Sequence, residues 1–111
     1  MADNNTRFAM EALKELDSGS IVAGYTGIGD ASEYPATGFI VQNFTNARLT
    51  FSLNGIEDNI KLPAMGFWIE DVASNRQNNK GTRLPLGTRF YVKRDETPTS
   101  GSVCVTIIYA K

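Results

Sequence analysis

The stretch RLTFSL, residues 48–53, alternates strictly between polar and apolar side chains. In an extended chain the apolar members share one face and the polar members the other: Leu49, Phe51 and Leu53 against Arg48, Thr50 and Ser52. This period of two predicts a β-strand with one buried face. Asn54-Gly55 follows at once and supplies a turn with positive φ, so residues 59–62 can return as the hairpin partner.

Segments on either side of this hairpin are short, rich in β-branched and aromatic residues, and bounded by Gly, Pro and Asn. They are Ile21–Ala23, Gly38–Phe44, Phe67–Val72, Leu84–Leu86, Arg89–Arg94 and Ser102–Ala110. No helix-length pattern lies between them, which argues against a parallel α/β sheet. Turn signals about every 8–12 residues predict an all-β fold of about seven to eight short strands, either an antiparallel sandwich, a jelly roll or a small barrel.

The N-terminal residues are predicted to differ from this β body. Their apolar side chains stand at the helical spacing i, i+3, i+4 and i+7: Ala9, Ala12, Leu13 and Leu16. We therefore expect a short helical arm over residues 1–19 and a β-sandwich domain over residues 20–111. A helix this short is marginal by itself, so a protein surface is expected to cover it. The expected contacts are Arg7, Phe8, Leu13 and Leu16.

The composition removes most catalytic chemistry. The chain has no histidine and a single cysteine, Cys104, which excludes a Ser-His-Asp triad and sites built from histidine or several thiolates. Acidic residues occur as neighbours, which point to opposite faces of a strand and do not converge on a cleft: Glu57-Asp58, Glu70-Asp71 and Asp95-Glu96. The loop Gly24–Gly29 lacks the Lys-Ser/Thr ending of a phosphate-binding loop. We expect no enzyme, no metal and no cofactor.

Charge is nearly balanced, with 11 basic and 12 acidic residues and a formal net charge of −1. Lys and Arg are not concentrated anywhere, so neither nucleic acid nor an anionic membrane is an expected partner. No apolar run approaches the length of a signal peptide or of a membrane span. The remaining expectation is a domain that binds other protein surfaces.

Aromatic residues in the expected strands are predicted to form the core: Phe39, Phe44, Phe51, Phe67, Phe90 and Tyr109. Trp68 follows Phe67 and must point to the opposite face of that strand. It either fills the second side of a buried strand or is an exposed anchor at an interface. The polar segment after this strand is predicted to be an exposed loop, and its residues Asn75, Arg76 and Asn78 join Trp68 as candidate contacts.

Five phrases of the β region carry a family resemblance. They are SIVAGY (20–25), VQNFT (41–45), LNGI (53–56), LPAMG (62–66) and TPTSGSV (97–103). Their order resembles the capsid staple, or decoration, protein of the epsilon-15 group of short-tailed phages, over about residues 20–110. These are turn and strand phrases, so they indicate a fold and a setting and not a chemistry.

The resemblance implies a jelly-roll-like antiparallel β-sandwich and a phage virion structural protein. Its implied role is to decorate and cement the icosahedral capsid by bridging neighbouring subunits of the major capsid protein. It further implies a homodimer that is made in the host cytoplasm and located on the outer capsid surface. No catalytic or ligand-binding residue carries over from the family.

Two other functions stay open. A head–tail adaptor, or a collar protein that anchors fibres, would belong to the same kind of virion in far fewer copies than the capsid subunits. A carbohydrate-binding β-sandwich would use Trp68, Tyr25 or Tyr34 as a stacking platform for sugar rings.

Overall fold

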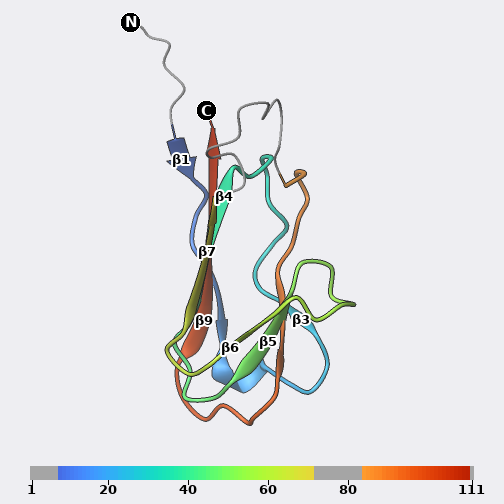
Figure 1. The fold of residues 1–111 in the computed structure, drawn as a ribbon, viewed down its shortest axis with the longest axis vertical. Coiled ribbons are helices and arrows are strands. Elements are labelled where there is room, and N and C mark those ends of the chain that lie inside the picture. The colour runs from blue at the N-terminus through green and yellow to red at the C-terminus, as the bar shows by residue number, and fades with distance from the viewer. Residues whose placement is uncertain (1–7, 72–83, 111) are drawn as a thin grey trace, which may run out of the picture.

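The computed structural model describes residues 8–71 and 84–110, and their strands form two antiparallel sheets (Figure 1). In chain order the strands are β1 (Phe8–Met10), β2 (Lys14–Asp17), β3 (Thr26–Gly27), β4 (Gly38–Asn43), β5 (Leu49–Ser52), β6 (Ile60–Leu62), β7 (Phe67–Asp71), β8 (Tyr91–Arg94) and β9 (Ser102–Ala110). The prediction of an all-β fold with antiparallel sheets is confirmed, although fewer strands were expected.

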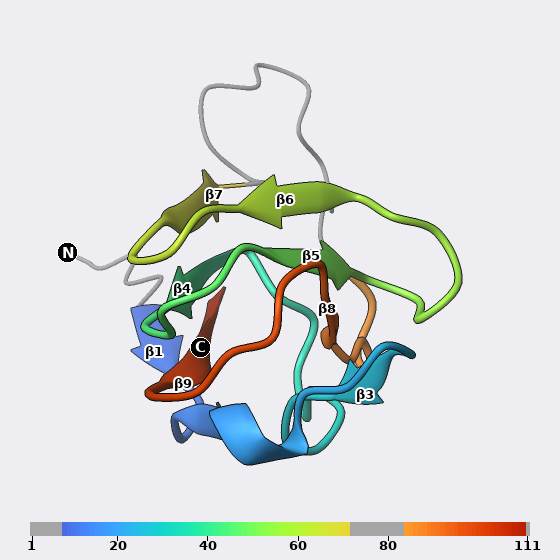
Figure 2. The same ribbon diagram turned by 90° about the horizontal axis from the view of Figure 1, so that it is seen from below.

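Sheet A has the order β1-β9-β4-β7, and β2 pairs with the same edge of β9 as β1 does. Sheet B has the order β3-β8-β5-β6. The nine-residue strand β9 pairs with the whole of β4, which pairs with β7 on its other edge. The edge strands β6 and β7 lie along one side of the molecule, as the view from below shows (Figure 2).

The core lies between the two sheets and draws on both. Its buried members are Ile21, Ile28, Ala36, Phe39, Val41, Ala47, Leu49, Phe51, Leu62, Phe90, Val92, Val103, Val105 and Ile107. The ring of Phe39 packs edge-on against the rings of Trp68 and Phe90, with centroids 4.8 and 4.9 Å away. This aromatic group joins β4 and β7 of sheet A to the residue that precedes β8 of sheet B.

Buried Asn43 fixes the corner where the chain passes from sheet A to sheet B. Its side-chain amide donates hydrogen bonds to three backbone carbonyls, those of Ala47, Leu62 and Pro63. Its side-chain oxygen accepts from the backbone N–H and the hydroxyl of Thr45. An amide buried without partners would cost free energy, so this set of bonds makes Asn43 compatible with complete burial.

The expected N-terminal helix is wrong for the described residues, which form β1 and β2 instead. A short helix is marginal alone, whereas an extended chain satisfies the N–H and C=O groups along the edge of the long strand β9. Leu16 points inward and packs against the core, while Leu13 is exposed. Residues 8–17 are therefore part of sheet A and not a separate arm in front of the β body.

The other predicted strands have mixed outcomes. Gly38–Phe44, the hairpin after residue 48, Phe67–Val72 and Ser102–Ala110 are confirmed to within a few residues. Ile21–Ala23 is not a strand, because Ile21 anchors the turn after β2 in the core, and sheet B takes Thr26–Gly27 instead. Leu84–Leu86 contributes only an isolated bridge to Ala36. The predicted loop over Ala73–Thr82 lies outside the described residues.

Candidate interaction surface

The side of sheet A that faces away from the core carries a group of large apolar side chains. Val41 and Val105 pair with each other and are fully buried, so the next paired residues along these strands, Ile40 and Thr106, point outward. The same alternation directs Phe67 and Ile69 of β7 outward, since they pair with Gln42 and Ile40. Met10 of β1 points outward with its partner Ile108.

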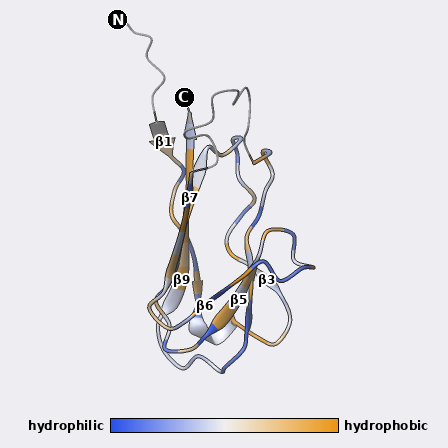
Figure 3. Ribbon diagram, in the orientation of Figure 1, coloured by the Kyte–Doolittle hydropathy of each residue, from blue (hydrophilic) through white to orange (hydrophobic). Residues whose placement is uncertain are grey.

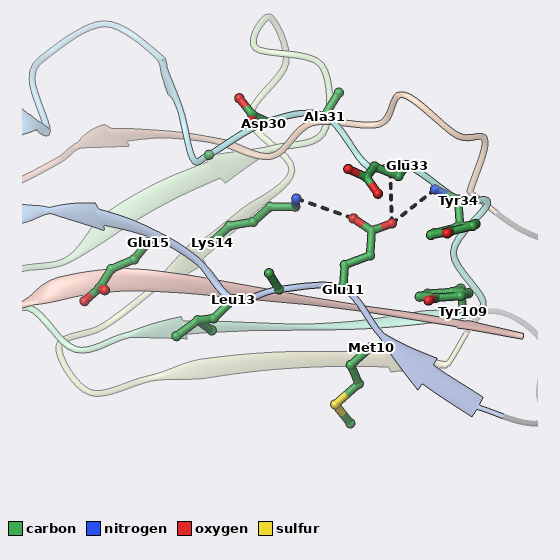
Figure 4. A pocket seen from close by; sticks show the side chains of 12 residues that line it. Met10, Glu11, Leu13, Lys14, Glu15, Asp30, Ala31, Glu33, Tyr34 and Tyr109 are labelled. Carbon is green, nitrogen blue, oxygen red and sulfur yellow. Dashed lines mark hydrogen bonds and ion pairs between the residues drawn. The ribbon is translucent and has the colours of Figure 1, made fainter. Parts of the chain in front are cut away.

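Leu13 joins this surface from the segment between β1 and β2. Figure 4 shows the side chains of Met10 and Leu13 pointing away from Glu11 and Lys14, which lie on the opposite side of the segment. We name this surface the outer face of sheet A. Its large apolar residues are Met10, Leu13, Ile40, Phe67, Ile69 and Ile108.

These side chains are unusually exposed for their size. Phe67 is 65% exposed, Met10 63%, and Leu13 and Ile69 58% each. Single exposed apolar residues are ordinary on monomers, but a contiguous group of them marks an interaction site. Hydrophobic residues run along β9 (Figure 3), where Val103, Val105 and Ile107 face the core and Ile108 faces outward. No element among residues 8–71 and 84–110 covers the face.

Polar residues of the face lie on its central strands, as Gln42 and Thr106, and at its β2 margin. Glu15 and Asp17 alternate with inward-facing Leu16, and the hydroxyl of Ser102 donates to the Glu15 carboxylate at 2.8 Å. Cys104 sits between Glu15 and Gln42 in the same row and is almost fully buried, which raises the pKa of its thiol. The rows that define this face contain no Lys or Arg among the residues described. A complementary partner therefore has apolar side chains for Phe67, Ile69 and Ile40 and a neutral or basic margin.

Sheet B presents a polar outer face whose charged and hydroxyl side chains bond one another. The Thr50 hydroxyl donates to one oxygen of Asp95 at 2.8 Å, and the Lys61 ammonium donates to the other at 3.1 Å. Arg48 adds an ion pair at 3.5 Å. Burial opposes ionisation of Asp95, but the bonds from Thr50 and Lys61 outweigh it and hold its pKa below the usual value.

A second polar cluster lies beside the first. The Tyr25 hydroxyl donates to Asp58, whose other close partner is the Lys93 ammonium at 2.9 Å. These two contacts lower the pKa of Asp58, while burial and the neighbouring carboxylate raise the pKa of Tyr25. Lys93 also lies 4.9 Å from the centre of the Tyr25 ring. Partners within the chain thus already engage the charges of this face.

A pocket of about 490 Å³ opens beside the segment between β1 and β2 (Figure 4). One carboxylate oxygen of Glu11 accepts the backbone N–H groups of Glu33 and Tyr34, at 3.0 and 3.1 Å, and the other pairs with Lys14 at 3.4 Å. The ring of Tyr34 stacks on that of Tyr109, with centroids 4.1 Å apart. Both carboxylate oxygens of Glu11 therefore have partners within the chain, and these contacts hold residues 33–34 against sheet A. We call this set of contacts the Glu11 latch and assign it a structural role.

The structure distributes the sequence-predicted contact residues widely. Leu13 lies on the outer face of sheet A, and Leu16 lies on its inner side. Phe8 belongs to β1, where only its backbone is described. Trp68 fills the second side of its strand, half-buried against the core, which was one of its two predicted positions. Arg7, Asn75, Arg76 and Asn78 lie outside the described residues.

Sequence reasoning missed most of the face itself. Phe67 and Phe44 were expected in the core, yet they are 65% and 46% exposed. The register with β4 directs Trp68 toward the core and Phe67 toward the outer face, so Trp68 takes the core position that was expected for Phe67. The available signal was that β4 and β7 carry apolar residues on both faces, which in a two-sheet protein leaves one apolar side without a layer to cover it.

Comparison of the chain with protein-family models, with curated protein sequences and with solved structures gave no match. In the described part of the chain, no helix is long and apolar enough to cross a membrane. The same residues contain no group of three or more Cys, Asp or Glu side chains arranged to hold a metal ion.

Proposed function

We propose that this chain is a phage virion structural protein that decorates the outer surface of an icosahedral capsid. It cements the capsid by bridging neighbouring subunits of the major capsid protein. The observation that carries the proposal is the contiguous apolar outer face of sheet A. A group of large, exposed apolar side chains on one sheet face is rare on monomeric proteins and is typical of protein interfaces.

The size of this face agrees with such a contact. Four strand positions across and about nine residues along β9 give a flat area of roughly 600 Å² at ordinary strand spacings. A standard interface buries about 800 Å² per partner. One face is therefore a modest site, and it suits a lattice on which many copies each add a small contribution.

We further propose that the sandwich is a jelly roll. The strand order supports this, since β2, β9, β4 and β7 form one sheet and β3, β8, β5 and β6 the other. From β2 onward every connection except β5–β6 crosses between the sheets, as expected for a double Greek key. Jelly rolls are frequent among capsid proteins, so this topology agrees with the proposed setting.

The carbohydrate-binding alternative has less support. Trp68 is packed against Phe39 and Phe90, and the Tyr25 ring lies under Lys93. A sugar ring needs one open aromatic face, and one face of each tyrosine is already covered, by Lys93 at Tyr25 and by Tyr109 at Tyr34. A head–tail adaptor would use the same kind of apolar face, so copy number separates it from a cement protein.

Quantitative mass spectrometry of purified virions tests the proposal by counting this chain against the major capsid protein. A copy number near that of the capsid subunits supports the cement role. A number that fits a single ring at one vertex supports the adaptor instead. Absence from the virion would overturn both functions.

A further inference from the structure

Strand β7 is an edge of sheet A whose backbone offers hydrogen-bonding groups outward. The Asn43 N–H donates to the Gly66 carbonyl at 2.8 Å, which sets the phase of the β4–β7 ladder. Bonded and non-bonded pairs alternate along an antiparallel ladder, so Trp68 bonds its partner Val41 through its own N–H and C=O. The N–H and C=O groups of Phe67 and Ile69 therefore point toward the open edge.

Only the first three residues of this edge lack the usual protection against strand addition, because the last two, Glu70 and Asp71, are acidic. Natural edge strands are blunted by charge, proline or a bulge. β7 begins with three apolar residues, Phe67, Trp68 and Ile69, and its first charge is Glu70. In the described part of the chain β4 is its only strand partner. The structure thus combines outward backbone groups with exposed apolar side chains on a single strand.

We propose that the open edge of β7 pairs with the β7 edge of a second copy of this chain, antiparallel, with the two-fold axis at Trp68. A two-fold contact places the same strand on both sides, and two such strands run antiparallel. In this register Phe67 of each copy faces Ile69 of the other, and each such pair exchanges both of its N–H···O bonds. The two Trp68 residues face each other as a non-bonded pair.

The register with its axis at Trp68 is more favourable than the two neighbouring registers. A shift that centres the axis on Ile69 sets Trp68 of each copy beside Glu70 of the other, an apolar ring against a carboxylate. A shift that centres it on Phe67 leaves Ile69 opposite Met65, a residue of the preceding turn with positive φ. The register centred on Trp68 pairs apolar residues with apolar residues, and Glu70 falls beside Gly66.

The biological role of the β7 dimer rests on the proposed function, because the dimer would explain how one decoration protein bridges two capsid subunits. The axis of an antiparallel pair stands perpendicular to the sheet, so both outer faces of sheet A point to the same side. The dimer then presents one continuous outer face of about twice the single area, roughly 1,200 Å². Each half can contact a different capsid subunit, which is the geometry that bridging requires.

The strength of the contact follows from its size. A few residues of paired strand lie at the low end of specific interfaces, so we expect a Kd on the order of 10–100 µM in solution. Neighbouring copies on a lattice experience a far higher effective concentration, which favours pairing there. Dimers are thus expected to depend on concentration in dilute solution.

Cysteine cross-linking reads the register directly. Phe67→Cys and Ile69→Cys chains are prepared separately in a Cys104→Ala background, mixed, and oxidised mildly at high concentration. Paired residues bring their Cα atoms to about 5.5 Å, within disulfide range, whereas diagonal positions lie at about 8 Å. We expect the mixture to cross-link at least ten-fold more than either variant alone. Cross-linking no greater than that of an Ile56→Cys control overturns the proposal, and cross-linking of one variant alone overturns the register.

Substitution of Ile69 by proline distinguishes the loss of a backbone hydrogen bond across the dimer from the loss of apolar side-chain area. Because the N–H of Ile69 points away from β4, Ile69→Pro removes no bond of the ladder, and Ile69→Ala keeps the N–H as the matched control. In sedimentation we expect Ile69→Ala to weaken the dimer a few-fold and Ile69→Pro to weaken it at least twenty-fold, with both variants folded by circular dichroism. If the two variants weaken the dimer equally, the N–H of Ile69 makes no bond across the contact and the proposal is wrong; if proline unfolds the chain, the cross-linking experiment decides.

Neither experiment contains capsid, so their failure is distinct from failure of the proposed function. A monomeric chain that is abundant on virions overturns the β7 contact and leaves the cement role standing. A β7-linked dimer that is absent from virions overturns the cement role alone.

Discussion

The two outer faces of the sandwich are both built from antiparallel strands, but one is polar and the other carries large exposed apolar side chains. On sheet B, long polar side chains lie across the strands and bond one another, as in the Thr50–Asp95–Lys61 cluster. On sheet A, Phe67 and Ile69 stand exposed beside an equally apolar Ile40. A face whose charges are paired internally has little to offer a partner, whereas an uncovered apolar face gains free energy when water is removed from it. Recognition of a partner is therefore proposed for sheet A and not for sheet B.

The largest expected effect comes from making sheet A resemble sheet B. The double variant Phe67→Ser/Ile69→Ser should lower affinity for capsids that lack this chain by about 100-fold or more, since buried anchors carry most of an interface's binding energy. Unfolding free energy should change by less than about 1 kcal/mol, because both side chains are already exposed. Co-sedimentation with capsids and urea titration measure the two quantities.

Ile56→Ser is the matched control for that experiment. Ile56 is 80% exposed but belongs to the loop that joins β5 to β6 in sheet B. It should leave capsid affinity unchanged. Equal losses in the two variants would mean that exposed apolar area, and not the outer face of sheet A, determines binding.

The next effect concerns the latch that positions Met10 and Leu13. Glu11→Ala leaves two backbone N–H groups and the largely buried Lys14 without their acceptor, which should cost about 2–3 kcal/mol of unfolding free energy. Glu15→Ala, on the exposed margin of the same strand region, should cost about 0.5 kcal/mol or less. Urea titration compares them, and similar losses would contradict the assigned role of Glu11.

The sequence predicted the central part of the fold for physical reasons that are local. The alternation in residues 48–53 and the turn at Gly55, whose φ is +75°, are properties of neighbouring residues, and both appear as expected. The N-terminal strands could not be predicted in this way. Their helical spacing is real, but the edge of β9 decides their conformation, and β9 lies some ninety residues further along the chain.

The candidate site was predictable only in part for the same reason. Whether Phe67 or Trp68 faces the core depends on the register with β4, and a shift of one residue would exchange them. Apolar residues on both sides of β4 and β7 were visible in the sequence, but the missing covering layer was not. Leu13, predicted as a contact residue of a helix that does not form, is exposed on the outer face of sheet A, and its contact role stays a prediction.

A smaller effect is expected from disturbing sheet B. Asp95→Asn removes the charge that Lys61 and Arg48 face and weakens the bond from Thr50, so it should cost about 1–2 kcal/mol of unfolding free energy. Capsid affinity should not change, because the cluster lies on the opposite side of the sandwich. Asp30→Asn, at an exposed loop position, is the control and should be nearly neutral. A loss of capsid affinity in Asp95→Asn alone would move recognition toward sheet B.

The smallest effect is the loss of stability at acidic pH, and the two carboxylates with lowered pKa values, Asp95 and Asp58, both lie on the side of sheet B. The pKa values of Asp95 and Asp58 are lowered in the folded state, so the stability they contribute is complete above the unfolded value of about 4 and is lost as pH falls through the lowered pKa values. The chain has no histidine, so the urea midpoint should be flat between about pH 5 and 8 and fall only below about pH 4. Asp95→Asn should reduce that fall, whereas Phe67→Ser/Ile69→Ser should retain it in full, because the apolar face has no part in it. A midpoint that rises on acidification would contradict the sign, and an unchanged fall in Asp95→Asn would remove this carboxylate as its source.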